Sequence, residues 1–114
     1  NYEYIVNLGG YVDYKKKKKT FNSHFVGCKN LVETLNKNYP KVFVQMGSSA
    51  EYGNNQSPLK ENEKCKPTNI YGKSKLLSTK YLLGIYISNP PEPVYPVLDK
   101  RISLQLLNFD VTCE

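Results

Sequence analysis

The segment KVFVQMGSSAEYG, residues 41–53, runs from an apolar stretch into a glycine, two serines and a Tyr-Gly pair. Lys41–Met46 is rich in β-branched and aromatic residues, so it predicts a short buried strand. Gly47, Ser48 and Ser49 follow that strand directly. In an open parallel sheet, ligands bind outside the carboxyl ends of the strands. We therefore expect these three residues to lie at a binding site and to present hydroxyl groups to the ligand.

A strand and a helix are predicted upstream of this segment. Residues 4–8, YIVNL, form a short β-branched run that is closed by two glycines, which is typical of a buried strand. From about Asn22, apolar residues recur at helical spacing, and Asn22 or Ser23 can act as the N-cap. Residues 36–40, NKNYP, are expected to end this helix.

Downstream, the sequence predicts a loop and a second helix. Residues 54–68 are rich in Asn, Pro, Lys and Glu and show no period, so we expect a long exposed loop. A helix is expected from Thr68 or Asn69, behind Pro67, to the Asn-Pro-Pro at residues 89–91. Its apolar stripe is expected at Leu77, Tyr81 and Ile85, broadened by Ile70, Leu76, Leu82 and Leu83. Strand, helix, strand and helix in this order predict parallel strands in an α/β fold.

Composition limits the classes of function. The 114 residues allow one domain, and a hydrophobic fraction of 39% suits a soluble core. The net charge of +6 owes much to the run Lys15–Lys19, which we expect to be a solvated loop. No arginine or aromatic residue interrupts the run, so a nucleic-acid-binding module is only a minor alternative. The three cysteines show no C-x-x-C spacing, so no metal site is expected. The first residues do not resemble a signal peptide, and a cytoplasmic location is expected, without a membrane span.

The stretch YGKSK, residues 71–75, carries the second half of the predicted chemistry. Tyr71 and Lys75 are four residues apart on a predicted helix and therefore share one face. An ammonium group beside a phenol favours the phenolate form, so Tyr71 is a candidate general acid or base. Ser48 would hydrogen-bond a substrate hydroxyl or carbonyl. These groups suit the interconversion of an alcohol and a ketone, which needs a nicotinamide as hydride acceptor because no side chain can accept a hydride.

These motifs together resemble a known family. NLGG at 7–10, GCKNLVETL at 27–35, GSSAEYG at 47–53 and YGKSK at 71–75 are similar to the central part of the extended short-chain dehydrogenase/reductases, the NAD-dependent epimerase/dehydratase family that acts on nucleotide sugars. The resemblance covers roughly residues 4–86.

The resemblance implies a role for each matching residue. Ser48 matches the catalytic serine or threonine, Tyr71 the catalytic tyrosine, and Lys75 the lysine that binds the nicotinamide ribose of NAD or NADP. The strand end that packs against the cofactor corresponds to Leu8, Gly9 and Gly10. Gly47 is expected beside the cofactor at the same edge of the sheet, and Ser48 and Ser49 are expected to contact a nucleotide-sugar substrate.

The sequence also departs from the family pattern. Sugar 4,6-dehydratases carry Asp-Glu where this chain has Ser49 and Ala50, so an epimerase or 4-ketosugar reductase is favoured over a dehydratase. His24 replaces an asparagine of many members, and we interpret it as a substitution that keeps a polar contact. No G-x-x-G-x-x-G loop is present, so this chain alone is expected to bind NAD poorly.

The predicted fold class is therefore a partial Rossmann-type, doubly wound parallel sheet, a βαβα fragment without the first βαβ unit. Residues 1–89 would form the central part of an NAD(P)-binding domain, and residues 90–114 a divergent segment with a weak strand signal at 94–98. The resemblance implies a longer, homodimeric parent enzyme. A catalytically silent Rossmann-like domain without cofactor is the main alternative.

Overall fold

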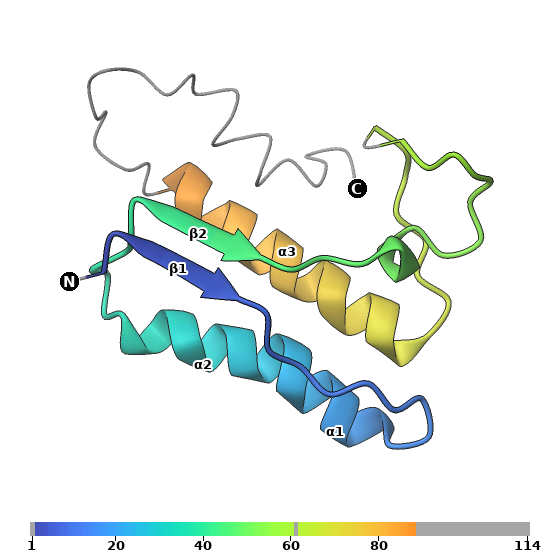
Figure 1. Ribbon diagram of the computed structural model, residues 1–114, viewed down its shortest axis with the longest axis horizontal. Coiled ribbons are helices and arrows are strands. Elements are labelled where there is room, and N and C mark those ends of the chain that lie inside the picture. Colours follow the sequence, from blue (N-terminus) through green and yellow to red (C-terminus); the bar gives the residue numbers. More distant parts are fainter. Residues whose placement is uncertain (1, 61, 89–114) are drawn as a thin grey trace.

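The structure is a computed structural model that describes residues 2–60 and 62–88. The predicted helix end at 89–91, the weak strand at 94–98 and the divergent segment at 90–114 lie outside the described residues. In the described part, two strands pack against helices in an α/β arrangement (Figure 1).

The two predicted strands are present and form a parallel pair, as predicted. β1 (Tyr4–Asn7) pairs with β2 (Val42–Gln45) in a register that sets Tyr4 opposite Val42 and Asn7 opposite Gln45. The Met46 amide donates to the Asn7 carbonyl at 3.1 Å and extends the ladder by one residue. The carboxyl ends of both strands thus meet at one edge, directly before Gly9 and Gly47.

The helical segment between the strands begins earlier than predicted. It comprises α1 (Lys17–Phe21), a π-helical turn η1 (Asn22–Val26) and α2 (Gly27–Thr34). The expected loop at Lys15–Lys19 is therefore wrong for its last three residues, and Asn22 lies inside the helical segment rather than at its N-cap.

Asp13 explains the earlier start. Its Oδ1 accepts hydrogen bonds from the backbone amides of Lys15 at 2.9 Å and Lys16 at 3.4 Å. These contacts fix the chain just before α1, and lysine is itself a good helix former. The Thr20 amide then donates to the Lys16 carbonyl at 3.0 Å. Sequence periodicity did not reveal this turn because it contains no apolar stripe.

After β2 the chain forms a short 3-10 helix, η2 (Ser49–Glu51), then the predicted loop, then α3 (Ile70–Ser88). Asn69 caps α3, since its Oδ1 accepts a hydrogen bond from the Gly72 amide at 2.8 Å. No described helix is long and apolar enough to cross a membrane.

The buried face of α3 differs from the predicted apolar stripe. Leu77 is 40% exposed, and Tyr81 and Ile85 are only partly buried. The residues that α3 buries include Ser74, Ser78 and Thr79, together with Lys75, Leu82 and Tyr86. Small hydroxyl side chains allow the helices to approach closely. Because these side chains are polar, the spacing of apolar residues does not reveal that they are buried.

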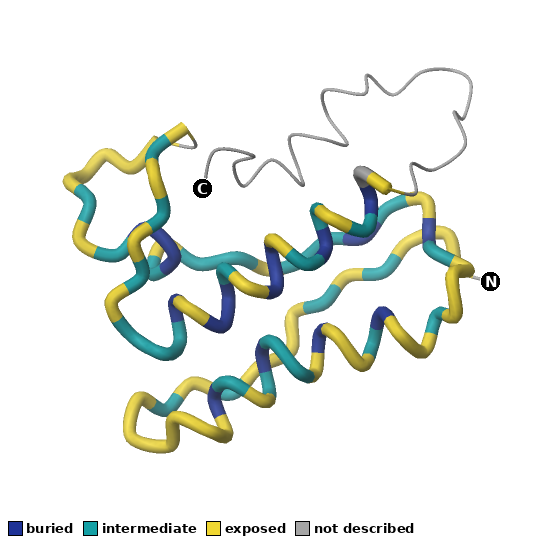
Figure 2. The backbone as a smooth tube through the Cα atoms, turned by 180° about the vertical axis from the view of Figure 1, so that it is seen from behind, coloured by how far each residue is buried: buried dark blue, intermediate teal, exposed yellow. Residues whose placement is uncertain are grey.

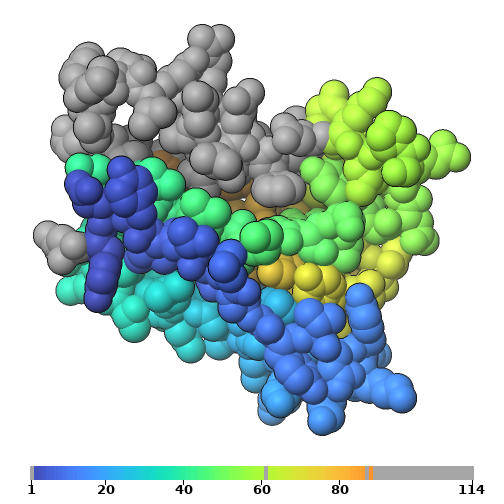
Figure 3. Space-filling view, viewed as in Figure 1, coloured from blue at the N-terminus to red at the C-terminus, as the bar shows by residue number. Residues whose placement is uncertain are grey.

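Among the described residues, the helices cover one face of the strand pair and no helix or strand covers the other, outer face. The core contains Cys28 and Val32 of α2, Phe43 of β2, and Leu82 and Tyr86 of α3 (Figure 2). Burial of a side chain such as Phe43 contributes about 1.5–3 kcal/mol. The outward residues Tyr4 and Val6 are 65% and 58% exposed, and the strands lie at the molecular surface in the space-filling view (Figure 3).

Candidate functional site

Ser48 lies where the sequence places it, directly after β2, and it caps η2. Its Oγ accepts a hydrogen bond from the Ala50 amide at 3.2 Å, and the Glu51 carboxylate accepts one from the Ser48 amide at 2.9 Å. This reciprocal pair is a capping box, which fixes the backbone on both sides of the hydroxyl. Because the Ser48 oxygen acts as an acceptor in the cap, its proton stays available for donation to a ligand.

Lys75 connects α3 with the end of β2 through a hydrogen bond. Its ammonium group donates to the Met46 carbonyl at 2.7 Å, and the residue is only 3% exposed. The same Nζ lies 5.9 Å from the centroid of the Tyr71 ring. The helix face shared by Tyr71 and Lys75 therefore points to the strand end that precedes Gly47 and Ser48.

Gly72 brings the first turn of α3 against η2. A Cβ at Gly72 would overlap the Ala50 carbonyl, so only glycine permits this approach. Tyr71 and the Ser48 segment thus belong to the same end of the sheet. Among the residues that the structure describes, no hydrogen bond joins the hydroxyls of Ser48 and Tyr71.

Glu51 is a site residue that the sequence analysis missed. It is 2% exposed, and its second carboxylate oxygen accepts a hydrogen bond from Thr79 Oγ1 at 3.1 Å. Burial raises the Glu51 pKa, while the hydrogen bonds from Ser48 and Thr79 and the charge of Lys75 act in the opposite direction. Glu51 therefore joins the Ser48 segment to α3. The S-x-x-E spacing of a capping box was the available signal.

His24 contacts the candidate catalytic tyrosine edge-on. The His24 and Tyr71 ring centroids are 5.1 Å apart with planes at 70°. Neither imidazole nitrogen forms a hydrogen bond of regular geometry in the described part of the chain, and its polar contact is a weaker one with the Tyr11 backbone. Burial and the positive charge of Lys75 lower the His24 pKa, against a smaller opposite effect of the Tyr11 backbone, and this favours a neutral ring.

The segment after β1 also packs against the His24 ring. Leu8 is 65% exposed, and Asn7 Oδ1 accepts a hydrogen bond from the Gly9 amide at 3.2 Å. Gly10 has φ of 155°, and a Cβ there would overlap the His24 imidazole. Gly10 is therefore needed for packing against His24.

The geometry brings most predicted site residues to one end of the sheet. Gly9, Gly10 and Gly47 follow the two strand ends, and Tyr71 and Lys75 approach from α3. Ser49 is exposed and lies in η2 beside Ser48. No group of three or more potential metal ligands occurs among the described residues.

The family model for the NAD dependent epimerase/dehydratase family matches residues 1–86 of this chain. The chain belongs to this family. No significant match was found among curated protein sequences.

Solved structures of similar fold include two UDP-sugar 4-epimerases and a protein solved with NADPH. The UDP-Glc/GlcNAc 4-epimerase of Campylobacter jejuni is 28% identical with a TM-score of 0.71, and the match covers 77% of this chain and 28% of that one. The UDP-N-acetylglucosamine 4-epimerase of Methanobrevibacter ruminantium is 24% identical with a TM-score of 0.68, over 75% of this chain and 29% of that one. RMD of Pseudomonas aeruginosa, solved with NADPH, is 22% identical with a TM-score of 0.68, over 75% of this chain and 32% of that one. The chain thus spans less than a third of the length of these structures.

The residues present fit one end of the dinucleotide that the family name implies. Gly9 is exposed, and its Cβ position meets only Asn7 Oδ1 at 3.4 Å, so the backbone is accessible to a ligand. Lys75 uses one of its three donors on Met46, which leaves two for a ribose. The sequence contains no glycine-rich loop for the pyrophosphate. Gly9 and Lys75 therefore fit the nicotinamide ribose end of the dinucleotide and not its pyrophosphate.

Proposed function

We propose that this chain supplies the Ser48, Tyr71 and Lys75 site of an NAD(P)-dependent nucleotide-sugar epimerase or 4-ketosugar reductase. The observation that carries the proposal is the buried Lys75 ammonium, which lies near the Tyr71 ring and is bonded to the carbonyl at the end of β2. No carboxylate among residues 2–60 and 62–88 forms a close ion pair with this cation, although its charge acts on the buried Glu51. This arrangement supports a functional role for its charge.

Each residue has a defined task in the proposed reaction. When a carbinol carbon is oxidised, Tyr71 takes the hydroxyl proton, and it returns that proton when the carbonyl is reduced. Ser48 donates a hydrogen bond to the same substrate oxygen and holds it in reach of Tyr71. The positive charge of Lys75 stabilises the negative charge that Tyr71 carries while its phenol oxygen is without a proton. A bound nicotinamide supplies the hydride acceptor and donor.

Two variants test the proposal in the natively expressed protein. Tyr71→Phe keeps the ring but removes the proton carrier, so interconversion of a UDP-sugar and its 4-epimer should slow by about 10²–10⁴-fold. Tyr81→Phe, on the same helix and away from the strand ends, is the matched control. Equal rates for Tyr71→Phe and the wild type would contradict the proposal and support the catalytically silent alternative.

The experiment on Ser48 must separate the proposed role of its hydroxyl in catalysis from its role as the cap of η2. Ser48→Ala removes the donated hydrogen bond and also the cap, which alone costs about 1 kcal/mol of stability. Ser48→Thr retains the hydroxyl and should restore both activity and stability. A hydroxyl that matters only for the cap would instead give an alanine variant that is less stable but fully active.

A further inference from the structure

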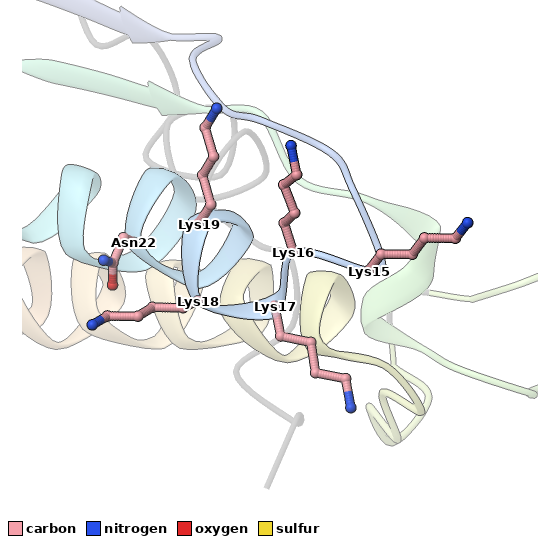
Figure 4. A pocket seen from close by; sticks show the side chains of 6 residues that line it. All are labelled: Lys15, Lys16, Lys17, Lys18, Lys19 and Asn22. Atoms are coloured by element: carbon pink, nitrogen blue, oxygen red, sulfur yellow. The ribbon is translucent and has the colours of Figure 1, made fainter.

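The five side chains of Lys15–Lys19, which we call the lysine patch, surround a shallow hollow that Asn22 also lines (Figure 4). All five residues are exposed. The ion pairs recorded in the described part of the chain are Lys29 with Glu33 and Lys41 with Glu3, so none of the five ammonium groups is paired there.

The nearest carboxylate, that of Asp13, is already occupied by other donors. Its Oδ1 binds the backbone amides of Lys15 and Lys16, and its Oδ2 accepts from the Tyr11 hydroxyl at 3.1 Å. Asp13 therefore shapes the backbone of the lysine patch and forms no close ion pair with its ammonium groups, although the charge of Lys19 helps to lower the Asp13 pKa. The patch keeps a strong positive field for a ligand from outside.

The lysine patch rests on a fixed base. Thr20 is fully buried, and its hydroxyl donates to the Asp13 carbonyl at 2.8 Å. α1 packs against α3, which carries Tyr71. Figure 4 shows that Lys16 and Lys19 point to the same side, whereas the other three side chains spread around the turn. The backbone is thus held in place while the ammonium groups can adjust to a ligand.

The lysine patch is continuous with the candidate site. Tyr14, which directly precedes Lys15, has its ring centroid 6.2 Å from that of Tyr71, with the planes at 80°. An anion bound by the first lysines would therefore lie close to the reacting end of a ligand at Tyr71.

Two aromatic residues near the lysine patch already contact other side chains, although Tyr14 remains 56% exposed. Lys19 Nζ lies 4.1 Å from the Tyr11 ring centroid, and Tyr14 packs against Tyr71. Proteins that bind single-stranded nucleic acids combine positive charge with several aromatic side chains on which successive bases stack, and the run Lys15–Lys19 contains no aromatic residue. Clustered lysines act as point charges and suit a compact phosphate group.

We propose that the lysine patch binds the diphosphate of a nucleotide ligand whose other end lies at Tyr71. The inference rests on the proposed function. The diphosphate could belong to a nucleotide sugar or to the dinucleotide, and the test separates these sources.

The test compares two variants that lose the same number of positive charges. One carries glutamine at all five positions of the lysine patch, a change that retains helix propensity. The control carries glutamine at five exposed lysines elsewhere, which are Lys37, Lys60, Lys64, Lys66 and Lys80. Binding of inorganic pyrophosphate, UDP and NAD⁺ to the natively expressed protein is measured by titration calorimetry at low and at physiological salt.

We expect the lysine-patch variant to bind pyrophosphate at least about tenfold more weakly than the control variant, with a smaller dependence on salt. Selective loss of UDP binding would identify the nucleotide sugar as the source, and selective loss of NAD⁺ binding the dinucleotide. Equal pyrophosphate binding by the two variants would overturn the proposal, as would tight oligonucleotide binding that pyrophosphate does not displace.

The result is independent of the test of catalysis. If Tyr71→Phe has full activity while the lysine-patch variant loses pyrophosphate, the proposed function fails and the anion site remains. If Tyr71→Phe is inactive while the two lysine variants bind alike, the catalytic proposal remains and the lysine patch has no ligand role.

Discussion

The His24 imidazole contacts both Gly10 and Tyr71. Its ring centroid is 5.1 Å from that of Tyr71, and the absence of a side chain at Gly10 provides the space that the imidazole occupies. Both ring nitrogens are buried, and neither forms a hydrogen bond of regular geometry in the described residues. Through this one side chain, the strand end after β1 supports the first turn of α3.

Gly10→Ala should destabilise the protein through His24. The added Cβ would overlap the imidazole, and φ of 155° is unfavourable for alanine, so we expect a loss of about 1–3 kcal/mol. Gly9→Ala is the matched control, because its Cβ would make only an ordinary contact. Combining Gly10→Ala with His24→Ala should recover part of the loss in urea unfolding. A strictly additive double variant would show that the two residues do not interact.

The His24 ring should make stability depend on pH. Burial and Lys75 lower its pKa below the ordinary 6.5, so the unfolded chain takes up a proton more readily than the folded one. The free energy of unfolding contributed by neutral His24 is fully present above 6.5 and is lost as the pH falls from there toward the lowered folded pKa. Unfolding curves between about pH 8 and pH 5 should show this slope in the wild type.

The control for the pH experiment is His24→Asn, which cannot titrate in this range. The variant should be less stable at neutral pH but should lose less stability on acidification. Parallel pH profiles for the two proteins would assign the slope to other groups and remove His24 as its cause.

The sequence predicted the elements whose signal is local and missed the contacts that depend on packing. Both strands and α3 follow from apolar runs and from Asn69 as a cap, and the shared face of Tyr71 and Lys75 follows from helical geometry. The first turn of α1 was missed because Asp13 organises it. Similarly, no periodicity reveals that Ser74 and Ser78 face the core while Leu77 is exposed.

In the candidate site too, local features could be predicted from the sequence, whereas contacts between distant residues could not. The position of Ser48 after a strand could be predicted, since the topology decides it. Glu51 contacts Thr79 across 28 residues, and His24 meets Tyr71 across an even longer separation. Such contacts arise only when α3 folds back on η1 and η2. A sequence alone specifies the residue types there but not which ones meet.

Thr79→Val tests the buried link between η2 and α3. The substitution keeps the shape of the side chain but removes the hydrogen bond to Glu51, whose second carboxylate oxygen is then left unsatisfied. We expect the free energy of unfolding to fall by about 1–3 kcal/mol at neutral pH. Thr68→Val, at an exposed position before α3, is the control and should change stability little. Similar unfolding midpoints for both variants would show that the Glu51 link contributes no stability.

The outer face of the strand pair should promote self-association of the chain. Val6 is 58% exposed, next to Tyr4 and Leu8 at 65% each, and β1 pairs with no strand other than β2 in the described residues. Such a face and edge favour contact between copies. Val6→Lys adds a charge to this face, so it should shift the chain toward monomer in sedimentation velocity runs over a range of concentrations. Leu77→Lys places the same charge on the exposed side of α3 and should leave association unchanged. A wild-type chain that is monomeric at every concentration, or an equal effect of both variants, would mean that the outer strand face is not the contact surface.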